Sequence, residues 1–289
     1  MHEPGQQRGN GLGSRFGRLS RTARIVAVAV VVVLLAAAGF TLASAAGPSK
    51  QTQASADAAR HATVKSALTP QQNRPGPVLL VPGYGGETGS LDALASQIRA
   101  EGRQAVVIQL PGSGTGSLVA DAAVLNSAVA AAMHRGAPSV DVVGYSAGGV
   151  VALLWARHDH GLRLARRIVT LGAPFHGTGL AAAALALVPG DCPAACRQLV
   201  PGSSLLAGLD VARGVGLPPW LSLWTADDQV VTPPDSARLA GAIDVQVQSV
   251  CPALAVSHTD MPSNSAVINM VLAAIGRAPL ARPAATACG

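Results

Sequence analysis

Short, uninterrupted apolar runs alternate with stretches of helical periodicity from about residue 75 onward. The first of these runs, 78–81, has no polar interruption, which is typical of a parallel strand buried on both faces. The runs predict strands at 78–81, 105–108, 140–143, 167–171, 221–224 and 243–247. The periodic stretches predict helices at 91–98, 117–133, 147–157 and 265–276. This alternation predicts an α/β fold with a mostly parallel central sheet of about six strands and helices on both faces.

The N-terminal part of the chain has a different pattern. Residues 1–24 contain five arginines and one glutamate, and residues 25–46 form an uncharged apolar run. A basic stretch, an apolar run and the small-residue motif Ala43-Ser44-Ala45 are the parts of a secretory signal peptide. Because the run is also long enough to span a bilayer, an uncleaved membrane anchor is the alternative. The positive-inside rule places the basic flank in the cytoplasm, so both alternatives export the rest of the chain.

Composition and charge complete the expected organisation. Residues 47–74 are rich in Gly, Ser, Gln, Thr and Ala without apolar periodicity, which predicts a disordered linker before a folded domain at 75–289. The net charge is +6, but residues 1–24 contribute +4 and leave +2 for the remainder. That remainder has no basic cluster interleaved with aromatic residues, so we expect no nucleic-acid partner.

The strongest chemical signal is the pentapeptide Gly144-Tyr145-Ser146-Ala147-Gly148. It lies between a predicted strand and a predicted helix, which is the context of the G-x-S-x-G nucleophile elbow. Side chains at the glycine positions would clash in so tight a turn, and the helix N-terminus directs a partial positive charge at the serine. We therefore predict Ser146 to be a catalytic nucleophile. A glycine-rich turn without chemistry is the alternative.

A serine nucleophile needs a histidine base and a carboxylate that orients it. In this arrangement the order along the chain is Ser, Asp or Glu, then His. His258 is the predicted base, because it alone follows both a late strand and a candidate acid loop. Asp227 and Asp228 both follow the strand at 221–224. We prefer Asp228, which begins the D-x-x-V-x-P spacing of many hydrolase acid loops, and Asp227 is the alternative.

The tetrahedral oxyanion of such a reaction needs two backbone donors. The N–H of Ala147 is one, and the N–H of Tyr84, in the loop after the first strand, is the other. A phosphate-binding role for that loop has little support, since neither G-x-G-x-x-G nor G-K-[ST] is present. We therefore expect no metal and no organic cofactor.

Other polar and apolar segments have structural alternatives. His176 is expected to form structural hydrogen bonds, His158 and His160 to lie at the surface, and Asp260 to cap the final segment or face solvent. The loop 112–116 either shapes the pocket or is a simple turn. The apolar helix predicted at 180–188 is either a lid or pocket wall near Ser146, or plain core.

Four cysteines follow the N-terminal segment. An even number in an exported chain implies two disulfides, with three possible pairings. Cys192 and Cys196 are close enough in sequence to pair locally, which leaves Cys251 and Cys288 for the second bond. A zinc site is the alternative, but no accompanying Cys/His pair has ligand spacing.

Several of these motifs together resemble those of a known family. The matching segments are 81–86, 110–116, 140–149, 171–178, 226–233 and 256–258. The chain from about Pro77 to Cys288 resembles the secreted actinobacterial class 2 lipases and esterases of the α/β-hydrolase superfamily, and is similar to bacillary minimal lipases and fungal lipase B.

The resemblance implies the nucleophile Ser146, the acid Asp228 and the base His258. It also implies a late disulfide, which fits Cys251–Cys288. The sequence departs from the family pattern at Pro82, where His is usual, and at Ala147, where Met or Gln is common.

We therefore expect an exported serine hydrolase that cleaves small-molecule or lipid esters through an acyl-enzyme. It would be secreted or extracytoplasmic, or anchored in the membrane by residues 25–46, with contact to a membrane or lipid surface, and a monomer. Two alternatives stay open: an acyltransferase that uses the same triad, and a catalytically silent binding module tethered to the cell envelope.

Overall fold

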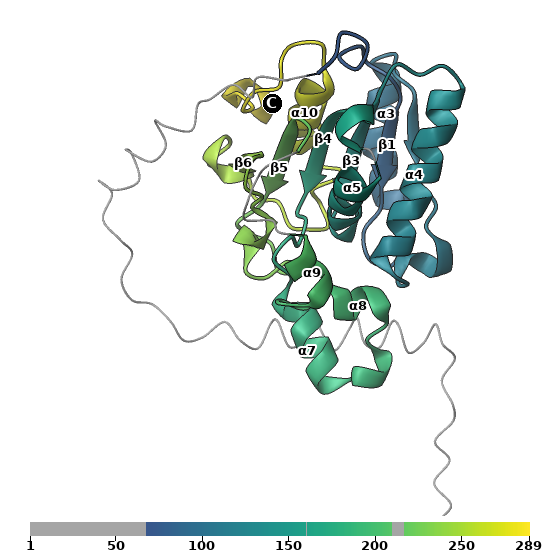
Figure 1. Cartoon of the computed structure of the whole chain (residues 1–289). Helices are drawn as coiled ribbons and strands as arrows, with labels where there is room; N and C mark the ends of the chain where they lie inside the picture. Colours follow the sequence, from purple (N-terminus) through teal and green to yellow (C-terminus); the bar gives the residue numbers. More distant parts are fainter. Residues whose placement is uncertain (1–67, 160, 210–216) are drawn as a thin grey trace, which may run out of the picture. The chain divides into compact units, whose positions relative to one another are not determined.

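The computed structural model describes residues 68–159, 161–209 and 217–289 (Figure 1). The chain divides into two units, Met1–Pro48 and Ser49–Gly289, and every described residue belongs to the second. The predicted signal or anchor at 1–46 and residues 47–67 of the predicted linker lie outside the described residues. In the described ranges, no helix is both long enough and apolar enough to cross a membrane.

In the described part of the chain, six parallel strands form one sheet in the order β2-β1-β3-β4-β5-β6. The strands are β1 (Val78–Val81), β2 (Ala105–Val107), β3 (Val140–Tyr145), β4 (Ala165–Leu171), β5 (Trp220–Trp224) and β6 (Ile243–Gln246). This confirms the predicted parallel sheet. β4 begins at Ala165 and not at Arg167, because Arg166 and Arg167 are buried within the strand.

Helices cover both faces of the sheet (Figure 1). The α-helices are α3 (Asp92–Ala100), α4 (Leu118–His134), α5 (Ala147–His158), α6 (Gly161–Leu164), α7 (Gly179–Leu187), α8 (Ala194–Gln198), α9 (Ser204–Gly208) and α10 (Ser265–Ile275). Short 3-10 helices are η1 (Gly89–Leu91), η2 (Pro111–Gly114), η3 (Pro189–Asp191), η4 (Pro234–Ala237), η5 (Val247–Ser249) and η6 (Ala285–Cys288).

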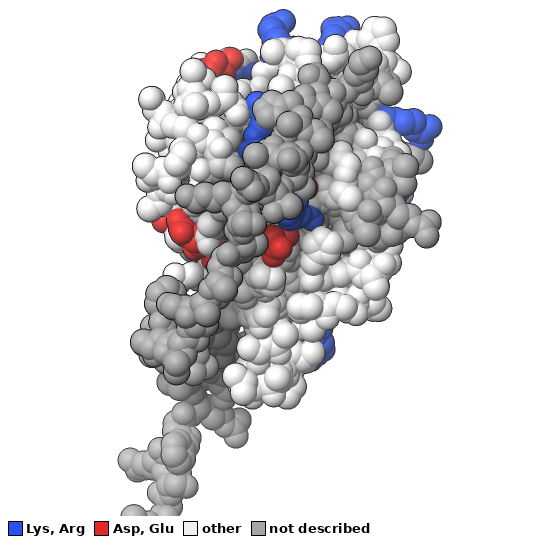
Figure 2. All heavy atoms as spheres, turned by 90° about the vertical axis from the view of Figure 1, so that its left-hand side faces the viewer, with Lys and Arg blue, Asp and Glu red and all other residues white. Residues whose placement is uncertain are grey.

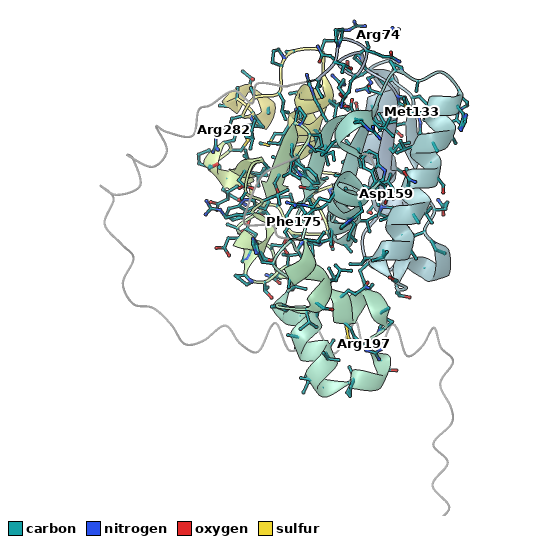
Figure 3. All side chains as sticks on the ribbon, in the orientation of Figure 1. Arg74, Met133, Asp159, Phe175, Arg197 and Arg282 are labelled. Carbon is teal, nitrogen blue, oxygen red and sulfur yellow. A yellow bond between two sulfur atoms is a disulfide. The ribbon has the colours of Figure 1, made fainter. Side chains whose placement is uncertain are left out.

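The sheet separates two hydrophobic cores, whose side chains fill the space between sheet and helices (Figure 3). Successive strand residues point to opposite faces. Leu79 and Val142 therefore enter the core under α4 and α5, whereas Leu80 and Val143 enter the core under α3 and α10. Burial on both faces explains why these strands lack polar alternation.

The packed part of the chain starts before the predicted boundary at Pro75. Gln72 is buried, and its side-chain amide donates hydrogen bonds to the carbonyls of Leu162 (3.0 Å) and Ala165 (2.6 Å). The carbonyl of Arg74 accepts a hydrogen bond from Ser139 Oγ at 2.6 Å. Gln72 and Arg74 thus contact the domain. The polar composition of residues 68–74 gave no sign of these contacts.

Between β4 and β5 the chain forms a small helical segment of α7, α8 and α9. It lies beyond the ends towards which the strand arrows point (Figure 1). In open parallel sheets, ligands bind at these carboxyl ends of the strands. The helical segment is therefore placed where it can border a site.

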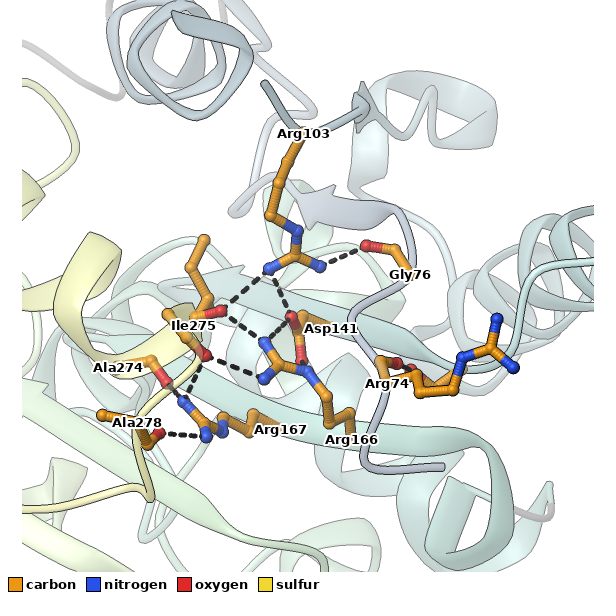
Figure 4. A network of polar contacts seen from close by, with 11 residues as sticks. Arg74, Gly76, Arg103, Asp141, Arg166, Arg167, Ala274, Ile275 and Ala278 are labelled. Carbon is orange, nitrogen blue, oxygen red and sulfur yellow. Dashed lines mark hydrogen bonds and ion pairs between the residues drawn. The ribbon is translucent and has the colours of Figure 1, made fainter. Parts of the chain in front are cut away.

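A polar network lies at the opposite, amino-terminal ends of the strands (Figure 4). Asp141 in β3 is fully buried and forms ion pairs with Arg103 (2.6 Å) and Arg166 (2.5 Å). Arg103, Arg166 and Arg167 also donate to carbonyls near the C-terminal end of α10. Burial, followed by the charge of Arg166, lowers the pKa of Arg167 to about 10. One carboxylate and the negative end of a helix dipole thus balance three arginines.

Replacing Asp141 with Asn is expected to lower the free energy of unfolding by about 3–5 kcal/mol, because it leaves buried guanidinium groups without a counter-ion. Urea denaturation followed by circular dichroism measures this loss. Asp191→Asn, at an exposed carboxylate in η3, is the matched control and should change stability by about 0.5 kcal/mol or less. Equal losses in the two variants would contradict the counter-ion role of Asp141.

Candidate active site

Ser146 occupies the sharp turn between β3 and α5. Its backbone has φ 53° and ψ −126°, which is unusual for a residue with a side chain. Such a conformation costs about 1–3 kcal/mol and persists only where the surrounding structure imposes it. The strained serine therefore points to a function for this turn.

The glycines of the pentapeptide permit this turn sterically. A Cβ atom on Gly144 would lie 2.6 Å from the carbonyl oxygen of Gly148. A Cβ atom on Gly148 would lie 2.3 Å from the carbonyl oxygen of Val81 in β1. Any larger residue at either position would therefore displace backbone, and the turn could not present Ser146 in this way.

His258 and Asp228 form a buried pair. The Nδ1 atom of His258 lies 2.7 Å from Oδ2 of Asp228, and both residues are buried. The other carboxylate oxygen, Oδ1, accepts backbone N–H bonds from Val230 (2.9 Å) and Val231 (2.7 Å). Both oxygens of Asp228 thus have partners, which fixes the carboxylate and directs it at the imidazole.

The neighbouring carboxylate, Asp227, has a different environment. Its side chain is exposed, and Oδ2 accepts hydrogen bonds from Gln248 Nε2 (3.2 Å) and from the backbone N–H of Val256 (3.4 Å). Asp227 therefore holds the chain segment just before His258. This geometry favours Asp228 over Asp227 as the acid.

The predicted triad residues converge at the end of β4. The N–H of Ser146 donates to the carbonyl of Leu171 at 2.8 Å. The next residue, Gly172, lies so close to the histidine pair that an added Cβ would be 3.0 Å from His258 Nδ1 and 3.2 Å from Asp228 Oδ2. The backbone of Ser146 and the His258–Asp228 pair thus lie beside consecutive residues, Leu171 and Gly172.

Tyr145, directly before the serine, contacts the histidine. Its ring centroid is 5.2 Å from that of His258, and its hydroxyl donates to the backbone carbonyl of His258 at 3.2 Å. Burial, and then the charges of Asp228 and Asp260, raise the pKa of Tyr145 far above its usual value. The hydroxyl therefore stays protonated and able to donate. Sequence reasoning treated Tyr145 only as the variable position of the motif.

The loop after β1 lies against the serine. A Cβ atom on Gly83 would be 2.9 Å from Cβ and 3.5 Å from Oγ of Ser146. Tyr84, the predicted donor, is the next residue in this loop, and Ala147 is the first residue of α5. Ala147 is thus bonded to Ser146 directly, and Tyr84 follows Gly83, which contacts Ser146. Their role in holding an oxyanion stays a prediction.

A second loop supports the first through a glycine–glycine contact. A Cβ atom on Gly114, which has φ 58°, would lie 2.8 Å from the backbone nitrogen of Gly86. Loop 112–116 therefore packs directly on the loop that carries Tyr84. The glycine-rich composition was visible in the sequence, but nothing in the sequence indicated this contact.

The remaining candidate residues have structural or surface positions. His176 is exposed, and its Nε2 lies 3.2 Å from the carbonyl oxygen of Arg238. His158 is exposed at the end of α5, and His160 lies outside the described residues. Asp260 is exposed and does not cap α10, because Asn264 accepts the N–H bonds of the first turn.

The four cysteines form the disulfides Cys192–Cys196 and Cys251–Cys288. The first joins Cys192, just before α8, to Cys196 within α8 (Figure 3, beside Arg197), and the second ties the C-terminus to the segment before His258. The described ranges contain no cluster of three or more His, Cys, Asp or Glu side chains suited to a metal ion.

Comparisons with known proteins identify the fold. No protein-family model matches the chain, and no curated protein matches its sequence. Among solved structures, Aspergillus fumigatus lipase B matches with a TM-score of 0.61 at 16% identity, over 76% of this chain and 57% of that one. The propeptide form of Bacillus licheniformis lipase BlEst2 matches with a TM-score of 0.58 at 18% identity, over 75% and 53%.

The mature form of the Bacillus licheniformis lipase matches with a TM-score of 0.51 at 19% identity, over 64% of this chain and 86% of that one. At these identities the likeness concerns the fold. The chain therefore has the α/β-hydrolase fold, as the sequence predicted, and its structural neighbours include lipases. It spans a little over half of the Aspergillus lipase, 57% of that chain.

Proposed function

We propose that this protein is an exported serine hydrolase that cleaves carboxylic esters through an acyl-enzyme intermediate. The observation that carries the proposal is the strained Ser146 beside the buried His258–Asp228 pair. An ordinary glycine-rich turn has no need of a non-glycine residue at positive φ, or of a histidine oriented by a buried carboxylate. The lipases among the structural neighbours fit this class of reaction.

The reaction begins at the serine hydroxyl. Asp228 accepts the Nδ1–H of His258 and leaves Nε2 unprotonated, so that this nitrogen can act as the base. As Ser146 Oγ bonds to the ester carbonyl carbon, its proton passes to Nε2. The carbonyl oxygen becomes an oxyanion, which the backbone N–H groups of Tyr84 and Ala147 hold.

Collapse of the tetrahedral intermediate releases the alcohol. The bond between the carbonyl carbon and the alcohol oxygen breaks, and His258 returns its proton to that oxygen. Water then attacks the acyl-Ser146 ester with His258 again as base, and the carboxylic acid leaves. If an alcohol took the place of water, the same site would transfer the acyl group.

We also propose that α7 contacts a lipid or membrane surface. Its sequence, residues 179–187, contains no polar or charged side chain, and Leu187 is 68% exposed. Two other large apolar side chains are also exposed: Tyr84, in the loop after β1, and Val119, at the start of α4. The lower part of the surface in Figure 2, the level of α7–α9 in Figure 1, carries few charged side chains. Exposed large apolar side chains suit contact with an oily substrate.

Export is supported by the disulfides, because such bonds persist in oxidising compartments. The basic and apolar N-terminal segment supplies either a signal peptide or an anchor, and the chain acts as a monomer.

Assays with p-nitrophenyl esters from acetate to palmitate test the proposed function. Hydrolysis of at least part of this series is expected, with preference for acyl chains that reach the apolar surface of α7. Added alcohol followed by product analysis separates hydrolysis from acyl transfer. A folded protein that releases no p-nitrophenol from any ester would refute the proposal and favour the silent binding module.

A further inference from the structure

Thr178, at the N-cap of α7, joins this helix to the loop that carries the acid. It is buried, and its hydroxyl donates to the carbonyl of Val230 at 2.6 Å. The same oxygen accepts backbone N–H bonds from Thr232 (3.1 Å) and Leu180 (3.2 Å). The one donor and both acceptor positions of the hydroxyl are thus in use. Two of the three partners lie in the loop after Asp228.

The path from this hydroxyl to the carboxylate runs through one residue. Thr178 holds the carbonyl of Val230, and the N–H of Val230 donates to Oδ1 of Asp228 at 2.9 Å. The carboxylate in turn places Oδ2 2.7 Å from Nδ1 of His258. A change in the position of Thr178 therefore moves the residue that orients the acid.

A second set of side-chain hydrogen bonds attaches the helical segment to the domain, and none of its partners contacts a triad residue. Gln198 in α8 accepts the N–H of Leu118 at 2.8 Å and donates to Ser117 Oγ at 3.3 Å. Both partners lie at the start of α4, on the other side of the helical segment. The Gln198 hydrogen bonds therefore hold the same segment without contact to the loop that follows Asp228.

We propose that Thr178 is a positioning residue that couples α7 to Asp228. With α7 in place, the Thr178 hydroxyl fixes Val230 and thereby the carboxylate against His258. When α7 moves away from this position, the acid loop loses this support. The coupling rests on the proposed ester hydrolysis and adds that the position of α7 controls turnover as well as access of substrate.

Three variants test the coupling. Thr178→Val removes the hydroxyl at nearly constant volume, and Thr178→Ser keeps it. Gln198→Leu removes the hydrogen bonds to Leu118 and Ser117 and is the matched control. With a soluble short-chain ester, Thr178→Val should lower kcat by about 10- to 100-fold with little change in KM, because a small misplacement of a catalytic group is costly. Thr178→Ser should restore kcat, and Gln198→Leu should lower only the melting temperature.

Hydrogen exchange of residues 226–233, measured by mass spectrometry, gives a readout that is independent of activity. Exchange should be faster in Thr178→Val and close to wild type in the other two variants. A Thr178→Val protein with wild-type kcat and wild-type exchange would overturn the coupling, as would an equal loss of kcat in Gln198→Leu. If the wild-type protein cleaves no ester, the proposed function fails, and the exchange comparison alone decides the coupling.

Discussion

Replacing Ser146 with alanine is expected to reduce ester hydrolysis on the order of 10⁶-fold, to the level of background. The variant lacks the oxygen that forms the acyl-enzyme, and no other group in the site can take its place in the proposed reaction. Initial rates with a p-nitrophenyl ester measure the loss, and circular dichroism shows whether the fold is retained.

Ala147→Gly is the matched control for the residue next to the nucleophile. The proposed contribution of Ala147 is its backbone N–H, which glycine also has, so substantial activity should remain. A comparable loss of activity in Ala147→Gly and Ser146→Ala would contradict the assignment of a backbone donor at this position.

Asp228→Asn is expected to lower kcat by about 10⁴-fold, because the amide no longer holds the histidine in the tautomer with a free Nε2. Asp228 is buried and lies 2.7 Å from His258, with both carboxylate oxygens engaged. Steady-state kinetics on a soluble ester measures this effect, and the change should fall mainly on kcat.

Asp227→Asn is the matched comparison, since the two carboxylates are adjacent in sequence. Asp227 is exposed and binds Gln248 and the N–H of Val256. An amide oxygen can still accept these hydrogen bonds, so only a small loss of activity is expected. If Asp227→Asn showed the larger loss, the assignment of the acid would be wrong.

The central strands of the sheet were predictable because their residues are buried on both faces. Such strands must be apolar almost throughout, so the runs at 78–81 and 221–224 stand out from their surroundings. The turn at Ser146 was predictable for a related reason. Its steric limits allow only glycine at positions 144 and 148, which leaves a short pattern in the sequence.

Other features depend on contacts between distant residues, and local pattern does not encode these. Asp141 lies within an apolar run, and the arginines that neutralise it come from other elements. The choice between Asp227 and Asp228 depends on which carboxylate faces the histidine. The hydrogen bond from Thr178 to Val230 links segments that are far apart along the chain.

The most direct test of Ser146 as an activated nucleophile is the reaction of the wild-type protein with a fluorophosphonate, followed by peptide mass spectrometry. This reagent phosphonylates serines that an adjacent base activates. We expect a single modified residue, Ser146, with no modification in Ser146→Ala and much slower modification in Asp228→Asn. Modification at a different residue, or none in the folded wild-type protein, would contradict the claim that Ser146 is an activated nucleophile.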